Sequence, residues 1–357
     1  MAKIDERKDT HIKICEEGEV QYKHPAGFED VHFVHNALPE LDLEKVKCLT
    51  EFLGRKLNAP IIISGMTGGT EKGLEINKKL AEGAQEKKVA LGLGSGRPML
   101  EDEGKAQYYM VRDVAPDVPI IANIGAVQLK EYDVGKIEGM VQKIEADGLA
   151  VHLNALQEAI QPEGETNFEN VYENIRKLCE GLDVPVIAKE TGAGINSNIA
   201  KKLFDGGVKW VEVSGKGGTS WSKVEYARGG RLQGFEEWGY PTIPAVAECA
   251  AFGNTICSGG VRNGIDAAKA IAIGAKISGA AMPFLKAENV GEEVENWVSQ
   301  IKTSMFLCGA KNLDELGEAP VLITGGSAEI MKLRGIDPSI YARRGGKGSS
   351  GKPSHYI

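Results

Sequence analysis

From residue 59 onward, short apolar runs rich in β-branched residues alternate with longer amphipathic stretches. The apolar runs are APIIISG (59–65), VALGLGS (89–95), PIIANIGA (119–126), GLAVHLN (148–154), VPVIAKE (184–190), KWVEVSG (209–215), NTICSGG (254–260) and AKISGAA (275–281). Stretches with helical spacing lie between them, among them residues 75–88, 168–182, 198–207 and 265–274. This alternation is typical of repeated βα units around a parallel sheet.

The eight units predict an α/β protein built as a closed (β/α)8 TIM barrel. An open dinucleotide-binding sheet is disfavoured because no unit opens with GxGxxG, the nearest string being GLGSGR (92–97). We place the barrel and a C-terminal helical segment, with a long helix at 292–310, within residues 59–336. Residues 1–58 form an N-terminal extension, and the basic, Gly/Ser-rich residues 337–357 are expected to be a mobile tail.

Composition narrows the choice of partners and compartment. The 357 residues are 42% hydrophobic and 26% charged, and the formal net charge of −8 argues against a general affinity for nucleic acid. No apolar run approaches the roughly 20 residues that span a bilayer, and the N-terminus is polar, so we expect a cytoplasmic protein without membrane insertion. The six cysteines form no CxxC pair and are expected to be free thiols.

Functional residues of barrel enzymes gather at the carboxyl ends of the strands. Here the last two strands are followed by SGGVRNG (258–264) and SGAAMP (278–283). Such glycines expose backbone N–H groups and a helix N-terminus to an anion, which favours a phosphate site, although they also serve simply to form tight turns.

Lys189 ends the apolar strand VPVIAKE, where a lone cation is costly to bury unless it faces an anion or a polar ring. The N1/C2-carbonyl edge of a flavin is one such partner. The alternative is a structural ion pair with Glu190 or Glu212, and Glu190 is expected to point to the opposite face of the strand.

The cluster HLNALQE (152–158) follows the fourth strand. His152 and Asn154 are two residues apart and therefore share one face, with Gln157 and Glu158 on the loop beyond. This arrangement favours a substrate pocket with one possible metal ligand, whereas a single histidine alone would more often be a satisfied core residue.

Arg7, Lys8 and His11 form a small cationic group that could fold over a pocket and bind a diphosphate. Glu6 and Asp9 balance this group, so charge alone favours a solvated terminus. His32 and His35 have no partner motif, and we assign them no metal.

Eight strings occur in a fixed order along the chain: RKDTH, SGMTGG, GSGR, NIGA, VHLNALQE, KETGAG, VSGKGGTSW and SGGVRNG. Together they resemble the type 2 isopentenyl diphosphate isomerases over roughly residues 5–335. The resemblance implies a barrel that binds FMN, needs NAD(P)H to reduce it, uses Mg2+ and interconverts isopentenyl and dimethylallyl diphosphate. It also implies a homo-oligomer, a tetramer or an octamer. The segment after Thr219, about residues 220–241, does not align with confidence.

The same resemblance implies roles for individual residues. The positions that match FMN contacts are Gly65, Met66, Thr67, Ser95, Asn123, Lys189, Ser214, Thr219, Gly259, Gly260, Val261, Ala280 and Ala281. The positions expected to bind the isoprenoid diphosphate substrate are Arg7, Lys8, His11, Ser95, Gly96, Arg97 and Gln157, and Glu158 matches the Mg2+ ligand. Gln157, His152 and Asn154 are expected to position the substrate over reduced flavin, which would exchange protons with the alkene.

Two other functions compete with this interpretation. FMN barrels that oxidise 2-hydroxy acids share the phosphate loops and the lysine, but they carry a histidine and an arginine beside the Gly-Gly of the sixth-strand loop. That loop here is SGKGGTS (214–220), with Lys216 and Thr219. A barrel that binds a phosphorylated ligand without catalysis is disfavoured because such a pocket has no need of the HLNALQE cluster.

Overall fold

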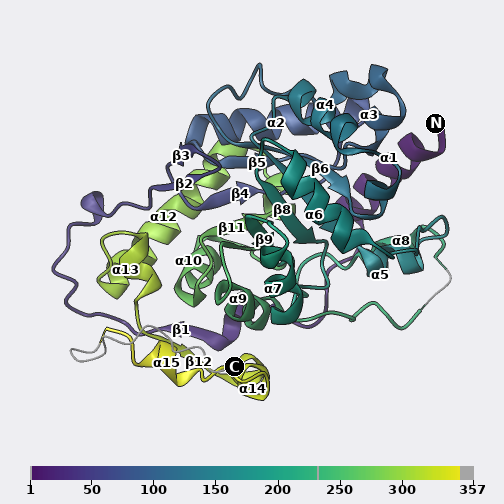
Figure 1. Ribbon diagram of the computed structural model, residues 1–357. Coiled ribbons are helices and arrows are strands. Elements are labelled where there is room, and N and C mark those ends of the chain that lie inside the picture. The colour runs from purple at the N-terminus through teal and green to yellow at the C-terminus, as the bar shows by residue number, and fades with distance from the viewer. Residues whose placement is uncertain (1, 231–232, 346–357) are drawn as a thin grey trace.

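A closed barrel of eight parallel strands lies at the centre of the molecule (Figure 1). The computed structural model describes residues 2–230 and 233–345, without the side chains of residues 2–7 and 9, and the strand count refers to those residues. The barrel strands are β4 (Ile61–Ile63), β5 (Ala90–Gly92), β6 (Ile120–Gly125), β7 (Gly148–Leu153), β8 (Val186–Glu190), β9 (Trp210–Glu212), β10 (Thr255–Cys257) and β11 (Ile277–Ala280). Neighbours in sequence pair in order and β11 closes on β4, which confirms the predicted (β/α)8 barrel.

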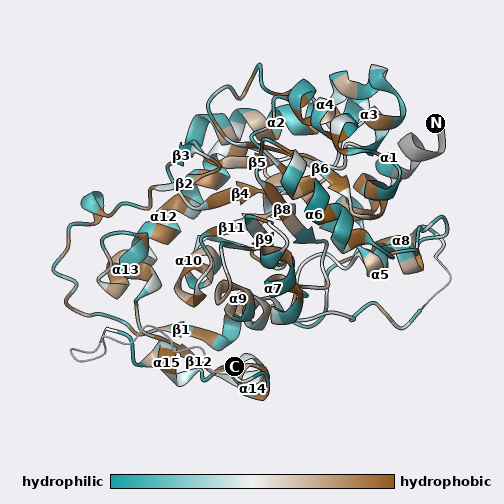
Figure 2. Ribbon diagram, in the orientation of Figure 1, coloured by the Kyte–Doolittle hydropathy of each residue, from teal (hydrophilic) through white to brown (hydrophobic). Residues whose placement is uncertain are grey.

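Helices surround the barrel, as the amphipathic stretches predicted. They are α2 (Glu71–Lys87), α4 (Val134–Ile144), α6 (Val171–Gly181), α7 (Ser197–Asp205), α9 (Thr242–Ala250), α10 (Gly264–Ile273) and α12 (Val290–Cys308). Shorter elements in the loops are α3 (Arg97–Glu101), η3 (Glu103–Tyr109), η4 (Val127–Lys130), α5 (Ala155–Ile160), α8 (Trp221–Ala227), α11 (Met282–Lys286) and α13 (Leu313–Gly317). The strands are mainly hydrophobic, whereas the helices carry both kinds of residue (Figure 2).

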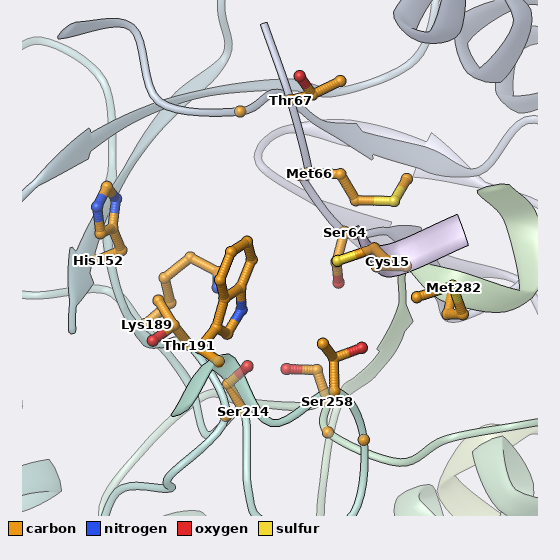
Figure 3. A pocket seen from close by; sticks show the side chains of 18 of the residues that line it. Cys15, Ser64, Met66, Thr67, His152, Lys189, Thr191, Ser214, Ser258 and Met282 are labelled. Atoms are coloured by element: carbon orange, nitrogen blue, oxygen red, sulfur yellow. The ribbon is translucent and has the colours of Figure 1, made fainter. Parts of the chain in front are cut away.

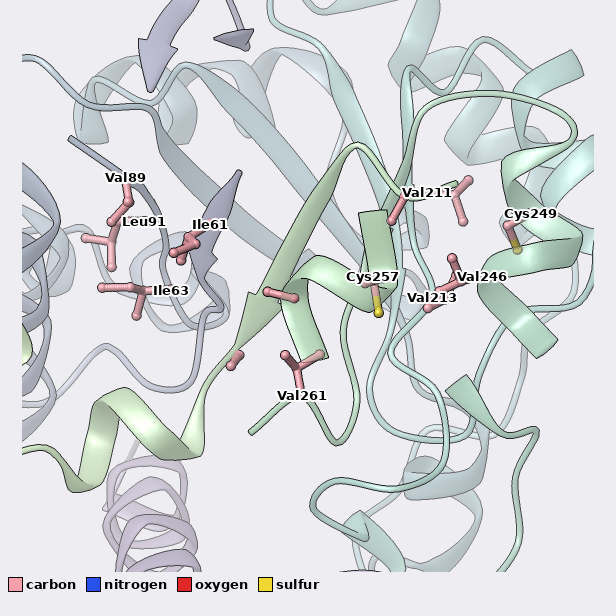
Figure 4. Close-up of a cluster of buried hydrophobic side chains, with 14 of the residues drawn as sticks. Ile61, Ile63, Val89, Leu91, Val211, Val213, Val246, Cys249, Cys257 and Val261 are labelled. Carbon is pink, nitrogen blue, oxygen red and sulfur yellow. The ribbon is translucent and has the colours of Figure 1, made fainter. Parts of the chain in front are cut away.

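The alternation of side chains along each strand separates two apolar clusters. One set packs between strands and helices, and Figure 4 shows part of it, including Ile61, Ile63 and Val246. The other set fills the barrel interior with Ile62, Ala90, Ile121, Ala150, Ile187, Ile256 and Ile277. Phe52 and Leu57 of the hairpin β2 (Thr50–Phe52) and β3 (Arg55–Leu57) join this inner set, and Trp210 packs against Phe52.

A polar layer lies directly above the inner apolar layer. Side chains along a strand alternate between its two faces, so the residue two positions after an inward-facing one also faces inward. At six strands this next residue is polar: Ser64, Asn123, His152, Lys189, Glu212 and Ser258. The ladder register brings three of them level, because His152 pairs with Lys189 and Lys189 pairs with Glu212 across β7, β8 and β9. The period of the strands thus produces a polar floor at the carboxyl end of the barrel.

The N-terminal extension packs against the barrel. Helix α1 (Ala2–Glu17) lies at the mouth with Ile12 buried, whereas charge alone had favoured a solvated terminus. The chain continues through η1 (Phe28–Asp30) to β1 (Val31–Phe33), which pairs antiparallel with β12 (Val321–Ile323), and then through η2 (Leu43–Lys45) to the hairpin.

The first residues of the segment predicted to be a mobile tail are packed against the rest of the protein. After α14 (Gly325–Leu333) comes α15 (Ser339–Ala342), in which Tyr341 is buried, and Arg344 donates a hydrogen bond to the carbonyl of Ala272. Residues 337–345 are therefore packed, and residues 346–357 lie outside the described part of the chain. All six cysteines are free, as expected. Among the described helices, none has the length and apolarity to cross a bilayer.

Candidate active site

A cavity of about 270 Å³ opens at the carboxyl ends of the barrel strands (Figure 3). Side chains and glycines from all eight strand ends reach it, and α1 and α8 cover it. The predicted site residues that line it are Lys8, His11, Gly65, Met66, Thr67, Ser95, Arg97, Asn123, His152, Asn154, Gln157, Glu158, Lys189, Ser214, Thr219, Gly259, Gly260, Val261, Ala280 and Ala281. Gly96 does not line it, and its N–H donates to the Asn123 carbonyl at 2.7 Å. Arg7 lies within α1, but its side chain is outside the described part.

Lys189 has two partners on the cavity floor. Its Nζ donates to the carbonyl of Glu190 at 2.8 Å and lies 3.8 Å from Oε1 of Glu212. The carboxylate of Glu190 faces away, as expected, and accepts N–H groups from residues 191–194. Burial nevertheless raises the pKa of Glu190. Lys189 is thus a buried cation with a carboxylate partner, and it also lines the cavity.

His152 and Asn123 form a second pair on the floor. His152 Nδ1 lies 2.7 Å from Asn123 Oδ1, and Asn123 Nδ2 donates to the Leu93 carbonyl at 3.1 Å. Since Asn123 Nδ2 is committed to that carbonyl, Oδ1 is left to accept from the imidazole. The ring of His152 is therefore held in a fixed orientation beside the cavity.

The loop after β10 has the backbone that a phosphate site requires. Gly259 and Gly260 have φ values of +95° and +79°, which other residues rarely adopt. A Cβ on Gly259 would lie 2.1 Å from the carbonyl oxygen of Gly215, so these glycines also let two loops approach closely. Arg262 follows them, lines the cavity and donates to the Gly217 carbonyl at 3.2 Å. This cation is not among the predicted site residues, although it stands inside the SGGVRNG string.

A carboxylate and amide cluster follows β7. Glu158 is buried, and its Oε1 accepts from Asn154 Nδ2 at 2.8 Å. Its Oε2 accepts from Gln161 and from the backbone N–H of Glu165, the latter at 2.8 Å. Asn154 Oδ1 is buried and makes no hydrogen bond within the described residues. The cluster is therefore pre-arranged, with one amide oxygen left free.

Arg97 lies beside this cluster and is bound by two carboxylates. Its Nε donates to Glu101 at 2.7 Å and its Nη1 to Glu165 at 2.6 Å. These two carboxylates together raise the pKa of the guanidinium even though burial acts in the opposite direction.

Two side chains of helix α1 attach it to the residues around the cavity. Lys8 Nζ contacts the carbonyls of Gly68 and Ser95 and the hydroxyl of Tyr109, the latter two at 3.1 Å. His11 Nε2 lies 3.0 Å from Oε1 of Glu225 on α8, and its ring stands edge-on to Trp221 at 5.2 Å between centroids.

Glu225 links His11 of helix α1 to Gln157, the predicted catalytic amide. The same Oε1 accepts from Gln157 Nε2 at 2.8 Å, and Arg228 binds the other oxygen. Burial favours the neutral acid, but His11, Gln157 and Arg228 outweigh it and hold the pKa of Glu225 below its ordinary value. Glu225 was missed because it lies in the segment that does not align, and Trp221 stands in the string VSGKGGTSW but was given no role. Tyr109 was missed because it lies outside every motif.

Comparisons with known proteins agree with this geometry. A family model described as FMN-dependent dehydrogenase matches residues 135–323. The isopentenyl-diphosphate delta-isomerase of Halobacterium salinarum is 44% identical over 348 residues, covering 92% of this chain and 96% of the relative. That of Pyrococcus furiosus is 43% identical over 363 residues, covering 96% and 92%. The chain belongs to the isopentenyl-diphosphate delta-isomerase family. The resemblance inferred from the motifs is thereby confirmed.

Solved structures of other proteins have a fold similar to that of this isomerase-family chain. A mandelate oxidase variant with an FMN adduct has a TM-score of 0.61 and 16% identity, covering 84% of this chain and 90% of its own. A lactate oxidase of Pediococcus acidilactici has a TM-score of 0.62 and 16% identity, covering 89% and 94%. At this identity the likeness shows a shared barrel fold only.

The sixth-strand loop distinguishes the isomerase-family chain from the oxidising alternative. Lys216 does not replace the missing histidine, because its Nζ donates a hydrogen bond to the Glu237 carbonyl at 2.7 Å. Thr219 Oγ1 accepts from Gln21 at 3.2 Å. Residues 214–220 contain no histidine and no arginine, so this loop supplies neither an imidazole base nor a guanidinium.

The residues present fit both a flavin and a substrate-bound metal. Thr67 Oγ1 is buried at the cavity without a hydrogen-bond partner among the described residues, as expected for a group that awaits a polar ligand. Within residues 2–230 and 233–345, no three His, Cys, Asp or Glu side chains are grouped to hold a metal. Mg2+ commonly takes one or two carboxylates and fills its shell with substrate phosphates and water, so Glu158 beside the free Asn154 Oδ1 suffices.

Proposed function

We propose that this protein interconverts isopentenyl diphosphate and dimethylallyl diphosphate with FMN and Mg2+ bound. The observation that carries the proposal is the pairing of two sites in one cavity. One is the polar floor with Lys189 beside the glycine loop of β10, and the other is the carboxylate cluster of Glu158 beside Arg97. Membership of the isomerase family supports the same reaction.

The floor and the glycine loops would hold FMN. Lys189 would offer a buried ammonium to an acceptor edge of the ring, and Thr67 and Ser214 line the same cavity (Figure 3). Gly259 and Gly260 would leave their N–H groups open to the phosphate, with Arg262 beside them. When bound and reduced by NAD(P)H, FMN would supply an electron-rich ring and an exchangeable proton.

The other end of the cavity would hold the diphosphate. Arg97, Lys8 and His11 line the cavity, and Lys8 contacts the carbonyl of Ser95. These residues would bind the diphosphate together with Arg7. Glu158 would hold Mg2+, whose remaining positions would be filled by phosphate oxygens. The cations and the metal would together neutralise the charge of the substrate.

Gln157, His152 and Asn154 would hold the alkene end in place. Glu225 fixes the amide of Gln157 so that its nitrogen points to the carboxylate, which leaves the amide oxygen oriented toward Asn154. Asn123 fixes the ring of His152. Helix α1 would exclude water, so that fixed dipoles act on a cation-like centre in a medium of low dielectric constant.

Turnover under anaerobic conditions tests this function. Purified protein with isopentenyl diphosphate, Mg2+ and NADPH should form dimethylallyl diphosphate without stoichiometric loss of NADPH. Steady consumption of NADPH or O2 with a 2-hydroxy acid would instead establish an oxidase. A colourless, inert protein would support a binding role.

Assembly into tetramers or octamers is part of the proposal. Large apolar side chains stand exposed at Leu38, Trp238 and Leu333, with exposed fractions of 72%, 61% and 80%. Contacts between copies would cover such residues. Sedimentation of the purified protein tests this directly, and a monomer would contradict it.

A further inference from the structure

Glu212 is a buried carboxylate on the floor of the cavity, and the proposed mechanism gives it no task. It is 4% exposed and lies at the end of β9. Its Oε1 accepts from Ser258 at 2.8 Å and from Ser64 at 3.3 Å, and lies 3.8 Å from Lys189 Nζ. Three strands besides its own thus supply groups that hold one oxygen of Glu212.

These contacts make the charge of the floor close to balanced. The two hydroxyl donors and the ammonium are the partners that a buried carboxylate requires. Lys189 is then a cation whose field is partly cancelled by Glu212. At 3.8 Å the pair is longer than the partly exposed pair of Arg97 and Glu165 at 2.6 Å, so the ammonium is not fully engaged by the carboxylate.

This balance matters for a ring that changes charge. Hydride transfer from NAD(P)H to bound FMN would release the nicotinamide as a cation and add one negative charge to the ring. An isolated ammonium nearby would stabilise that charge, raise the reduction potential and lower the proton affinity of the reduced ring. A carboxylate beside the ammonium reduces each of these effects.

We propose that Glu212 is a positioning residue that weakens the field of Lys189 and thereby keeps the reduced flavin basic enough to exchange protons. The inference rests on the proposed FMN site. Glu212 acts through Lys189 and through the electrostatic potential at the floor of the cavity. This role does not require Glu212 to contact the substrate. Proton exchange is most effective when donor and acceptor have similar proton affinities, which is the property that Glu212 adjusts.

The test is the midpoint potential of bound FMN in the Glu212→Gln protein, measured at one fixed pH by spectroelectrochemical titration. Without the carboxylate, Lys189 should favour reduced over oxidised FMN by at least about tenfold, an upward shift of about 30 mV for a two-electron couple. Glu212→Asp keeps the charge but withdraws it from Lys189, and a smaller upward shift is expected.

Glu248→Gln is the matched control. Glu248 is also a buried carboxylate in an ion pair, with Arg334 at 2.7 Å, but it lies on α9 in the helical layer. The Glu248→Gln substitution removes the same charge and should leave the midpoint potential of FMN unchanged. A yellow Glu212→Gln protein with an unchanged or lower potential would overturn the proposal, as would an unchanged Glu212→Asp potential if the Gln variant loses its flavin. A wild-type protein that binds no FMN would instead contradict the proposed function.

Discussion

Arg97 and Glu165 form an ion pair of 2.6 Å between Nη1 and Oε1 at the end of the cavity proposed for the diphosphate. The backbone N–H of Glu165 also donates to Oε2 of Glu158 at 2.8 Å. Glu165 thus contacts both Arg97, proposed to bind the diphosphate, and Glu158, proposed to bind its Mg2+. A phosphate that binds Arg97 would compete with Glu165 for this guanidinium.

Replacing Glu165 by Gln should tighten the binding of inorganic pyrophosphate in the absence of Mg2+. The neutral side chain no longer competes for Arg97, whereas the backbone N–H to Glu158 is retained. Because the pair is partly exposed, it is worth at most about 1 kcal/mol, or about fivefold in affinity. Titration calorimetry measures the change. Glu173→Gln, which removes a similar charge from the exposed partner of Arg176, is the control, and weaker binding by the Glu165 variant would contradict the exchange.

Replacing Glu158 by Ala should leave the protein yellow but suppress turnover and its dependence on Mg2+. The side chain contacts Asn154, Gln161 and the loop at Glu165, and none of these belongs to the polar floor. The absorbance of bound flavin and the rate over a series of Mg2+ concentrations give the two readouts. Full activity with unchanged Mg2+ dependence would remove Glu158 from the metal site.

Replacing Lys189 by Ala should abolish FMN binding and destabilise the apoprotein. The variant leaves Glu212 as a buried carboxylate without its ammonium, which typically costs about 3 kcal/mol or more. Adding Glu212→Gln should recover part of the free energy of unfolding without restoring FMN. Denaturant titration of the wild-type protein and these two variants checks this, and a double variant no more stable than Lys189→Ala would show that the two residues are not coupled.

The contribution of Glu225 to stability should depend on pH. Its pKa is lowered in the folded protein, so the contribution is complete above the ordinary value of 4.5 and is lost as the pH falls through the folded value. At pH 7, Glu225→Gln should cost about 1–3 kcal/mol, since it weakens the contacts with His11 and Arg228. The difference between wild type and variant should shrink below pH 4.5. A difference that grows on acidification would contradict the ionised state of Glu225.

The sequence predicted much of the barrel because strand alternation is local. The period of two places Ser64, Asn123, His152, Lys189 and Ser258 on the inner face above an apolar layer, and the structure has them there. The level at which strands meet is set by closure of the whole barrel. The sequence alone could therefore not show that Lys189 and Glu212 are level on neighbouring strands, and Glu212 was only one of two predicted ion-pair partners for Lys189.

Other parts of the site depend on packing between distant segments. Glu225 lies against His11 because α1 packs on α8 across more than 200 residues of sequence, and no local pattern encodes that contact. Glu165 reaches Glu158 because Gly164 turns the loop back tightly: a Cβ there would lie 1.7 Å from the Glu158 carbonyl oxygen. Tyr109 is a buried residue whose hydroxyl lies 2.5 Å from the Ser95 carbonyl, and no motif in the sequence contains it.

Proton exchange in heavy water tests the central claim most directly. The protein would be reduced with dithionite without oxygen, supplied with Mg2+ and isopentenyl diphosphate in D2O, and followed by NMR and by the flavin spectrum. The account predicts that dimethylallyl diphosphate forms with deuterium in its carbon skeleton while the flavin stays reduced. Reoxidation of the flavin in proportion to substrate loss, or no interconversion by a protein with fully reduced FMN, would contradict it.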